Sequence, residues 1–259
     1  MIPTLTRITL YPIKSLDGVT VERATILASG ALQHDRTYVL TDVSGRFVNG
    51  KRDARIHQVR SHFSPDLSTV TLAAPGYSPS RPLSLTEDRD DLAAWFSDFF
   101  QQLITLQADF HQGFPDDTDS LGPTIVSTAT LETVASWYDL SLEECRRRFR
   151  PNLEIGSASA FTEDQLFSAQ GQPVPFHIGG VMLVGINPCQ RCIVPTRDSQ
   201  TGLPTPDFQK RFVTEREKTL PAVVARSRFN HFYRLTVNTR IAADFTGHHL
   251  TVSDPVILP

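Results

Sequence analysis

Residues 181–192 read VMLVGINPCQRC, an apolar run that leads directly into two cysteines with C-x-x-C spacing. The first six of these residues carry no charge and are mostly valine, leucine and isoleucine. A short apolar run of this kind predicts a buried strand. We therefore expect Cys189 and Cys192 to lie where a buried strand ends.

Strand patterns also dominate the rest of the chain. Stretches rich in β-branched and aromatic residues, separated by turn signals, predict strands at residues 4–11, 19–27, 37–41, 69–73, 232–237 and 250–258. Helices are few, and we expect them at residues 90–101, 129–139 and 207–218, with a short one capped by Ser141 that ends near Arg148. Strands and helices do not alternate regularly, so the sequence predicts a β-rich mixed α/β fold and not a doubly wound sheet.

Residues 110–124 separate two β-rich halves. This stretch is rich in Asp, Gly and Pro and has no regular hydrophobic period, which is typical of a loop. A long loop in a compact protein is often functional. We predict two domains, at residues 1–115 and 116–259, and the second carries the cysteine motif.

The composition narrows the class of protein. The 259 residues are 40% hydrophobic and carry a formal net charge of −3, whereas a general nucleic-acid binder usually shows a basic excess. No run approaches the ~20 apolar residues that span a bilayer, and residues 1–14 alternate like a strand and lack an export signal. Three cysteines are too few for a disulfide framework. We therefore expect a cytoplasmic protein that binds neither nucleic acid nor a membrane.

The C-x-x-C pair by itself leaves three interpretations open: a ligand for a metal or cofactor, a dithiol redox pair, or two packed thiols. A structural zinc site needs four ligands, but the remaining cysteine is Cys145, and His57 and His62 lie far upstream. We expect these two histidines to pack or to lie on the surface. A redox dithiol needs its first cysteine at a helix N-terminus, whereas the residues after Cys192 favour a strand or loop.

Arg191 favours the first interpretation. Its fixed positive charge stands beside Cys192 and would favour thiolate over thiol. A thiolate is a soft ligand that suits a transition metal. Arg191 therefore favours metal ligation over the other two interpretations, which stay open at this point.

The extended cysteine motif and four further segments make the signal specific. In chain order they are YPIKSLDG at residues 11–18, DRTY at 35–38, FRPNL at 149–153, PCQRCI at 188–193 with Asp198 and Gly202, and VSDPVIL at 252–258. This set resembles the MOSC family with an N-terminal MOSC β-barrel domain, which includes the bacterial YcbX-type proteins and the mitochondrial amidoxime-reducing components. The resemblance implies an N-terminal MOSC β-barrel domain followed by a MOSC β-barrel, similar to the pyruvate-kinase barrel, with a few peripheral helices.

The same resemblance implies a cofactor and its site. In the family a pterin dithiolene and one cysteine thiolate hold molybdenum, and Cys192 stands at the position of that metal-binding, catalytic cysteine. The residues that we expect to bind the cofactor are cations and hydrogen-bonding side chains, namely Lys14, Ser15, Arg36, Lys51, Arg150, Asn152 and Arg191. Lys51 replaces an arginine that is frequent in relatives, so it keeps the charge without the planar fork. We interpret Arg146, Arg147 and Arg148 as a solvated helix end.

The resemblance further implies a molybdenum-dependent oxidoreductase that reduces small N-hydroxylated compounds. No cysteines remain for an iron–sulfur cluster, so electrons would come from a separate ferredoxin, flavoprotein or haem protein. An alternative is a carrier of the molybdenum cofactor or of sulfur, similar to the MOSC part of sulfurases, with a persulfide on Cys189. A third interpretation is a barrel that binds an anionic partner without metal.

Overall fold

The molecule is built around an eight-stranded sheet with the order β15-β11-β12-β13-β9-β10-β1-β2. The computed structural model describes residues 2–259, so residue 1 of the first predicted domain lies outside the described residues. The strands of this sheet are β1 (Thr4–Leu10), β2 (Val19–Val21), β9 (Ile125–Ser127), β10 (Leu153–Gly156), β11 (Val174–Ile178), β12 (Val181–Gln190), β13 (Arg234–Ile241) and β15 (Val256–Ile257). Within it only β9 and β10 pair in parallel.

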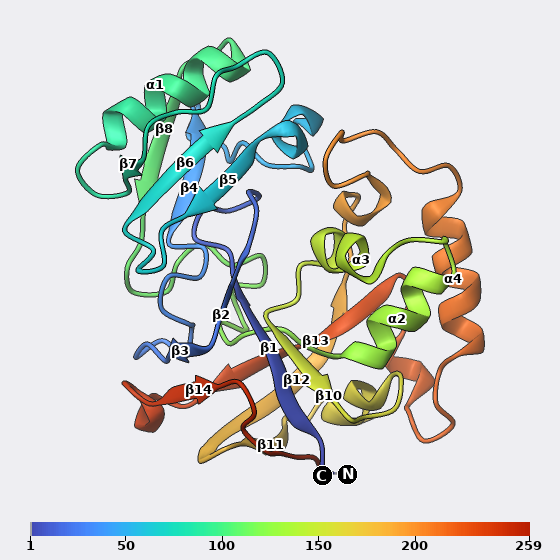
Figure 1. Ribbon diagram of the computed structural model, residues 1–259. Helices are drawn as coiled ribbons and strands as arrows, with labels where there is room; N and C mark the ends of the chain where they lie inside the picture. The colour runs from blue at the N-terminus through green and yellow to red at the C-terminus, as the bar shows by residue number, and fades with distance from the viewer. Residues whose placement is uncertain (1) are drawn as a thin grey trace.

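The sheet closes on itself as a barrel. The backbone N–H of Leu5 donates to the carbonyl of Asp254 at 2.9 Å, and that of Val256 donates to Pro3 at 2.8 Å. These bonds join β1 to the chain beside β15, which removes two exposed sheet edges. Pro3 and Val256, near the two ends of the described residues, consequently lie next to each other. Figure 1 shows β1 beside the last residues of the chain.

Alternating side chains fill the barrel. In β1, Ile8 and Leu10 are two positions apart and both buried, and they meet Leu153, Leu183 and Val237 from other strands in one core cluster. Because side chains on a strand alternate between two faces, each strand sends one apolar set inward. The first strand of the chain is therefore part of the same barrel as the strands of the second half.

A second lobe stands beside the barrel (Figure 1, upper left). It contains the pair β4 (Tyr38–Asp42) and β8 (Ile104–Ala108), the sheet β5 (Arg60–Phe63), β6 (Thr69–Ala73) and β7 (Leu83–Ser84), and helix α1 (Arg89–Phe100). Leu92 and Phe96 of α1 are fully buried in the core of this lobe. Strands β3 (Arg23–Thr25) and β14 (His249–Thr251) pair separately.

Three helices, all on one side of the barrel, complete the fold (Figure 1, right). They are α2 (Thr128–Ser136), α3 (Leu142–Phe149) and α4 (Phe208–Lys218). Ser127 and Ser141 cap α2 and α3, each accepting a hydrogen bond from a backbone N–H three residues on. Short 3-10 helices are η1 (Ala54–Gln58), η2 (Thr162–Leu166), η3 (Val194–Thr196), η4 (Arg226–Arg228) and η5 (Ala243–Phe245).

The predicted fold class is confirmed as β-rich and mixed α/β. Helix α1 differs from the prediction by one residue at each end, and β12 continues four residues further than the apolar run. Strands β5, β7, β8, β9, β10 and β11 were not predicted. The division at residue 115 stays a prediction. Nowhere in residues 2–259 is a helix long and apolar enough to span a membrane.

Candidate functional site

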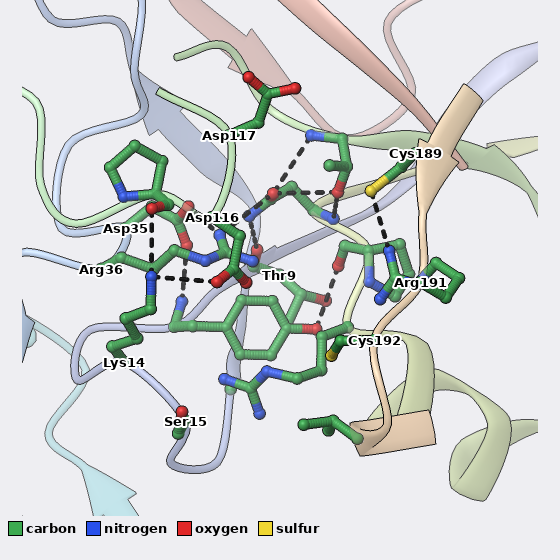
Figure 2. A pocket seen from close by; sticks show the side chains of 18 of the residues that line it. Thr9, Lys14, Ser15, Asp35, Arg36, Asp116, Asp117, Cys189, Arg191 and Cys192 are labelled. Atoms are coloured by element: carbon green, nitrogen blue, oxygen red, sulfur yellow. Dashed lines mark hydrogen bonds and ion pairs between the residues drawn. The ribbon is translucent and has the colours of Figure 1, made fainter. Parts of the chain in front are cut away.

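A pocket of about 560 Å³ is lined by residues of both the second lobe and the barrel. All eight residues named from the sequence line it: Lys14, Ser15, Arg36, Lys51, Arg150, Asn152, Arg191 and Cys192. Figure 2 shows Lys14 and Asp116 on one side of the view and Cys189, Arg191 and Cys192 on the other. The structure thus brings together side chains that are separated by up to 178 positions in the sequence.

The pocket is strongly basic, although the whole chain is acidic. Eleven lysines and arginines line it, against six aspartates and glutamates. Such a concentration of one sign inside a low-dielectric cleft raises the local concentration of the opposite charge. The pocket therefore suits an anionic ligand.

A carboxylate already holds the two lysines of the site. Asp116 Oδ1 lies 3.1 Å from Lys14 Nζ and 3.3 Å from Lys51 Nζ. Lys14 Nζ also donates to the carbonyls of Phe114 (2.7 Å) and Pro115 (3.1 Å). The surrounding pocket walls partly desolvate the Asp116 carboxyl, which opposes its ionisation, but Lys14, Lys51 and Arg36 outweigh this and hold its pKa well below the usual range. An ammonium has three donors, so all those of Lys14 are in use.

Two arginines stack on Tyr11 at the centre of the pocket. The Arg150 guanidinium lies 4.1 Å from the ring centroid and that of Arg36 lies 5.0 Å from it. Burial raises the pKa of Tyr11 to about 12 despite both cations, so the phenol stays neutral. Arg36 is paired with Asp35, whereas Arg150 Nη2 is buried without any hydrogen-bond partner. An unsatisfied buried donor of this kind calls for a ligand or an ordered water.

Asn152 differs from the other predicted contacts. Its amide donates to the carbonyl of Thr9 at 3.0 Å, and its Oδ1 accepts from Thr124 at 3.2 Å and from Arg36 at 3.3 Å. Its side chain is 2% exposed. Asn152 therefore positions Arg36 and the start of β9, and its bonds are satisfied within the protein.

Three of the predicted residues have unusual backbone conformations. Ser15, Arg36 and Arg150 have φ angles of 73°, 54° and 52°, in the left-handed region that favours glycine. Such strain persists only where the surrounding structure enforces it, and it gathers at functional sites. Arg150 reaches this conformation as the residue that ends α3.

The two cysteines follow an irregular stretch of β12. The register between β12 and β13 shifts between Pro188 and Gln190, and Thr236 on the facing strand has a φ of 68°. Bulges are frequent beside active sites because they redirect side chains. Both Cys189 and Cys192 are free thiols of intermediate exposure. In residues 2–259 no three His, Cys, Asp or Glu side chains form a metal cluster.

Arg191 contacts the first cysteine of the motif. Its Nη1 donates to Cys189 Sγ at 3.3 Å (Figure 2). Its Nη2 donates to the carbonyl of Phe149 at 2.6 Å. Its third nitrogen, Nε, is buried without a hydrogen-bond partner. From the sequence we expected Arg191 to support Cys192, but its hydrogen bond goes to Cys189.

The prediction of a solvated helix end at Arg146, Arg147 and Arg148 is wrong. Arg148 is 3% exposed and donates to Glu144 at 2.6 Å, and Arg146 donates to Glu154 at 2.8 Å. These two carboxylates allow the end of α3 to face the pocket, because they balance the arginine charges.

Sequence reasoning also missed Asp116 and His57. Asp116 lies in the irregular loop, where no pattern marks one aspartate among several. His57 in η1 is only 9% exposed, as packing would require, but it lines the pocket and its Nε2 has no hydrogen-bond partner. Only their positions in the folded structure identify these two residues as part of the site.

A closed barrel is thus joined to a second lobe, and the basic, thiol-lined pocket between them has the charge that suits an anionic ligand. Comparison with known families makes this specific: the MOSC N-terminal beta barrel domain matches residues 2–103 and the MOSC domain matches residues 124–245. The chain belongs to the MOSC family.

Two groups of relatives stand out. The chain is 26% identical over 237 residues to mitochondrial amidoxime reducing component 2 of Bos taurus, which covers 77% of this chain and 68% of the relative. It is 26% identical over 243 residues to molybdenum cofactor sulfurase of Drosophila grimshawi, covering 79% of this chain but 29% of that protein. A molybdenum cofactor sulfurase of rice (Oryza sativa subsp. japonica) is 23% identical over 234 residues, covering 73% of this chain and 27% of its own.

Proposed function

We propose that this chain is a molybdenum-cofactor-binding oxidoreductase that reduces small N-hydroxylated compounds, with Cys192 as its metal ligand. The observation that carries the proposal is one basic pocket that contains a free thiol, buried unpartnered arginine donors and every residue expected from the family. Relatives named as amidoxime reducing components and as molybdenum cofactor sulfurases support the cofactor.

The residues present fit a molybdenum–pterin group. Its anionic part needs cations, which Arg150 and Arg191 offer through buried donors that have no partner in the protein. Its metal needs a soft ligand, which Cys192 offers as a free thiol on the pocket wall. The uncharged phenol of Tyr11 supports the planar guanidinium of Arg150 from below, so that its fork stays oriented.

When bound, the cofactor supplies a metal that changes oxidation state and so delivers two electrons to the substrate. The reaction proposed is R–NHOH + 2 e⁻ + 2 H⁺ → R–NH₂ + H₂O, in which the N–O bond breaks and the oxygen leaves as water. The protein binds and orients both molecules and restricts water in the cleft. The electrons come from a separate ferredoxin, flavoprotein or haem protein, and we place this activity in the cytoplasm.

A second candidate is a carrier of the cofactor or of sulfur without reductase activity. The contact between Arg191 Nη1 and Cys189 Sγ at 3.3 Å favours it, because the guanidinium is placed to hydrogen-bond to sulfur carried on Cys189. The named sulfurases among the relatives are much longer than this chain, so their activity does not follow from the match.

A pair of cysteine variants tests the proposal. Protein produced in a host that makes the cofactor is analysed for molybdenum and for pterin fluorescence. Cys192→Ala should lose the metal and the reductase activity, while the matched Cys189→Ala should keep most of the metal. Stoichiometric molybdenum in Cys192→Ala would sink the assignment.

Turnover is then measured with reduced viologen as an artificial electron donor and benzamidoxime as substrate. Loaded wild-type protein should form the amidine, while NADH alone should give none without an electron-transfer partner. Loaded protein that reduces no N-oxygenated compound would contradict the reductase function. Cyanide-releasable sulfur on Cys189 would then support the carrier.

A further inference from the structure

His57 lines the pocket but has no role in the reaction proposed above. It belongs to η1, in the second lobe, and its side chain is only 9% exposed. Its Nε2 is buried and has no hydrogen-bond partner, although the residue lines the pocket. Buried polar atoms are nearly always paired in folded proteins, so an unpaired one in a cleft wall needs an explanation.

Gly50 packs against this nitrogen and places no side chain in front of it. A Cβ at Gly50 would lie 2.8 Å from His57 Nε2 and 3.2 Å from Val194 Cγ2. The backbone of Gly50 is not in the left-handed region, so its conformation does not require glycine. The steric reason for glycine is therefore the imidazole itself. Val194 lies two residues after Cys192, which puts His57 at the cysteine end of the pocket.

The imidazole is uncharged at neutral pH. Burial, together with the charges of Arg150, Arg197 and Arg60, lowers the pKa of His57 to about 4, and Asp198 offsets only part of this. A neutral imidazole offers either a donor or an acceptor at Nε2, depending on its tautomer. An anionic group of a ligand would bind to the nearby arginines and not to an uncharged imidazole. We therefore expect His57 to bind an uncharged polar group.

We propose that His57 is a ligand-contacting, specificity-determining residue, whose Nε2 hydrogen-bonds to an uncharged nitrogen-containing group of the bound molecule. This inference deepens the proposed function and rests on it. Two molecules share the required chemistry: the pterin ring of the cofactor, and the amidine-like nitrogen group of an N-hydroxylated substrate. Both present N–H donors and nitrogen lone pairs without charge.

Equilibrium binding to the full, metal-free chain tests this with two uncharged probes, 6-hydroxymethylpterin and benzamidoxime. His57→Leu removes the hydrogen bond and should weaken at least one probe by roughly fivefold or more, while His57→Gln, which keeps a neutral polar group, should restore most of the affinity. Inorganic phosphate should bind equally to all variants. His62→Leu is the matched control, because His62 is exposed on β5.

The identity of the weakened probe distinguishes the two sources: loss of pterin binding assigns His57 to the cofactor, and loss of benzamidoxime binding alone assigns it to the substrate. Gly50→Ala should act like His57→Leu, because its methyl group crowds Nε2. If His57→Leu fails to fold, ¹⁵N spectra of histidine-labelled wild-type protein replace it, and one of the probes should shift the His57 Nε2 resonance.

The inference is overturned if wild-type protein binds neither probe, or if both probes bind His57→Leu as they bind wild type. It is equally overturned if neither probe moves the His57 resonance. The proposed function fails separately: a chain that binds a probe through His57 but never holds molybdenum would overturn the cofactor assignment and leave His57 as a ligand contact.

Discussion

Replacing Asp116 with asparagine should tighten the binding of inorganic phosphate to the pocket. Asp116 Oδ1 contacts both Lys14 Nζ, at 3.1 Å, and Lys51 Nζ, at 3.3 Å, so an anion that uses these lysines must displace it. Asparagine keeps the size and an oxygen acceptor but removes the competing charge. The two lysines then turn to the incoming ligand at a smaller cost.

The size of the effect follows from the exposure of the pair. The Asp116 side chain is 61% exposed, so each ion pair falls in the range of about 0.2–1 kcal/mol that surface pairs contribute. Two such pairs together give about 1 kcal/mol, or roughly a fivefold lower Kd for phosphate. The effect should shrink at high salt, because exposed charges are screened.

The assay is isothermal titration of phosphate into wild type, Asp116→Asn and a matched control, Asp117→Asn. Asp117 is the next residue and also lines the pocket, but its carboxylate accepts from Asn238 Nδ2 at 2.7 Å, not from a lysine. Both variants change the net charge by the same amount, so only the specific competition differs. If Asp116→Asn binds phosphate no tighter than Asp117→Asn, the lysines are not the anion's partners and the reasoning is refuted.

Acid stability gives an independent check on the same contact. The pKa of Asp116 is lower in the folded protein than in the unfolded chain, so its ion pairs stabilise the fold when the carboxyl is ionised in both states. This stabilisation is complete above the pKa of aspartate in the unfolded chain, and it is lost as the pH falls towards the lower pKa of the folded state. Asp116→Asn should therefore be less stable than wild type at pH 7 by about 1 kcal/mol. The difference should shrink as the pH falls below about 4.

Three further variants test other parts of the structure. Arg150→Ala should weaken cofactor binding by about 1.5–3 kcal/mol, and Arg150→Lys should recover only part of this affinity. The measurement is the amount of pterin retained after dialysis, and unchanged retention in Arg150→Ala would show that Arg150 does not bind the cofactor. Glu163→Gln should stabilise the protein at pH 8 but not at pH 4, because burial and Asp164 raise the pKa of Glu163 to about 7, and a carboxyl with a raised pKa destabilises the fold once the pH exceeds that pKa. Denaturant unfolding at both pH values measures this, and an equal gain in stability at both would contradict it. Gly185→Ala should cost about 3 kcal/mol or more in thermal melts, because its Cβ would lie 1.9 Å from the carbonyl oxygen of Leu166; a near-neutral result would mean that β12 shifts freely.

The elements that the sequence predicted well are those with a strong hydrophobic period. Helix α1 carries Leu92, Phe96 and Phe99 on one buried face, and its predicted bounds differ from the structure by one residue. Strands β9 and β10 were missed because they are three and four residues long and lie wholly buried, so they show no alternation. Their pairing with β1 and β13 is long-range information that no local window contains.

Sequence motifs predicted which residues belong to the candidate site, but not how those residues contact one another. The motifs named Lys14, Arg36, Arg150 and Cys192, and the structure gathers their side chains around one pocket. The motifs do not reveal that Asn152 satisfies its bonds within the protein, because this depends on where Thr9 and Thr124 lie. Partner geometry of this kind exists only after the lobe and the barrel have come together.

The electrostatics of the pocket show most clearly why composition alone misleads. A net charge of −3 excludes a broadly basic surface, yet the pocket concentrates eleven cations against six anions. Within the pocket, the cations differ in whether their donors are already paired. Arg150 and Arg191 each keep a buried donor without a hydrogen-bond partner. Lys14, Lys51 and Arg36 already pair with carboxylates. A ligand gains most where donors are desolvated and unpaired, since no existing bond must break. The anionic part of the ligand should therefore depend more steeply on Arg150 and Arg191 than on the lysines, although the motifs rank them alike.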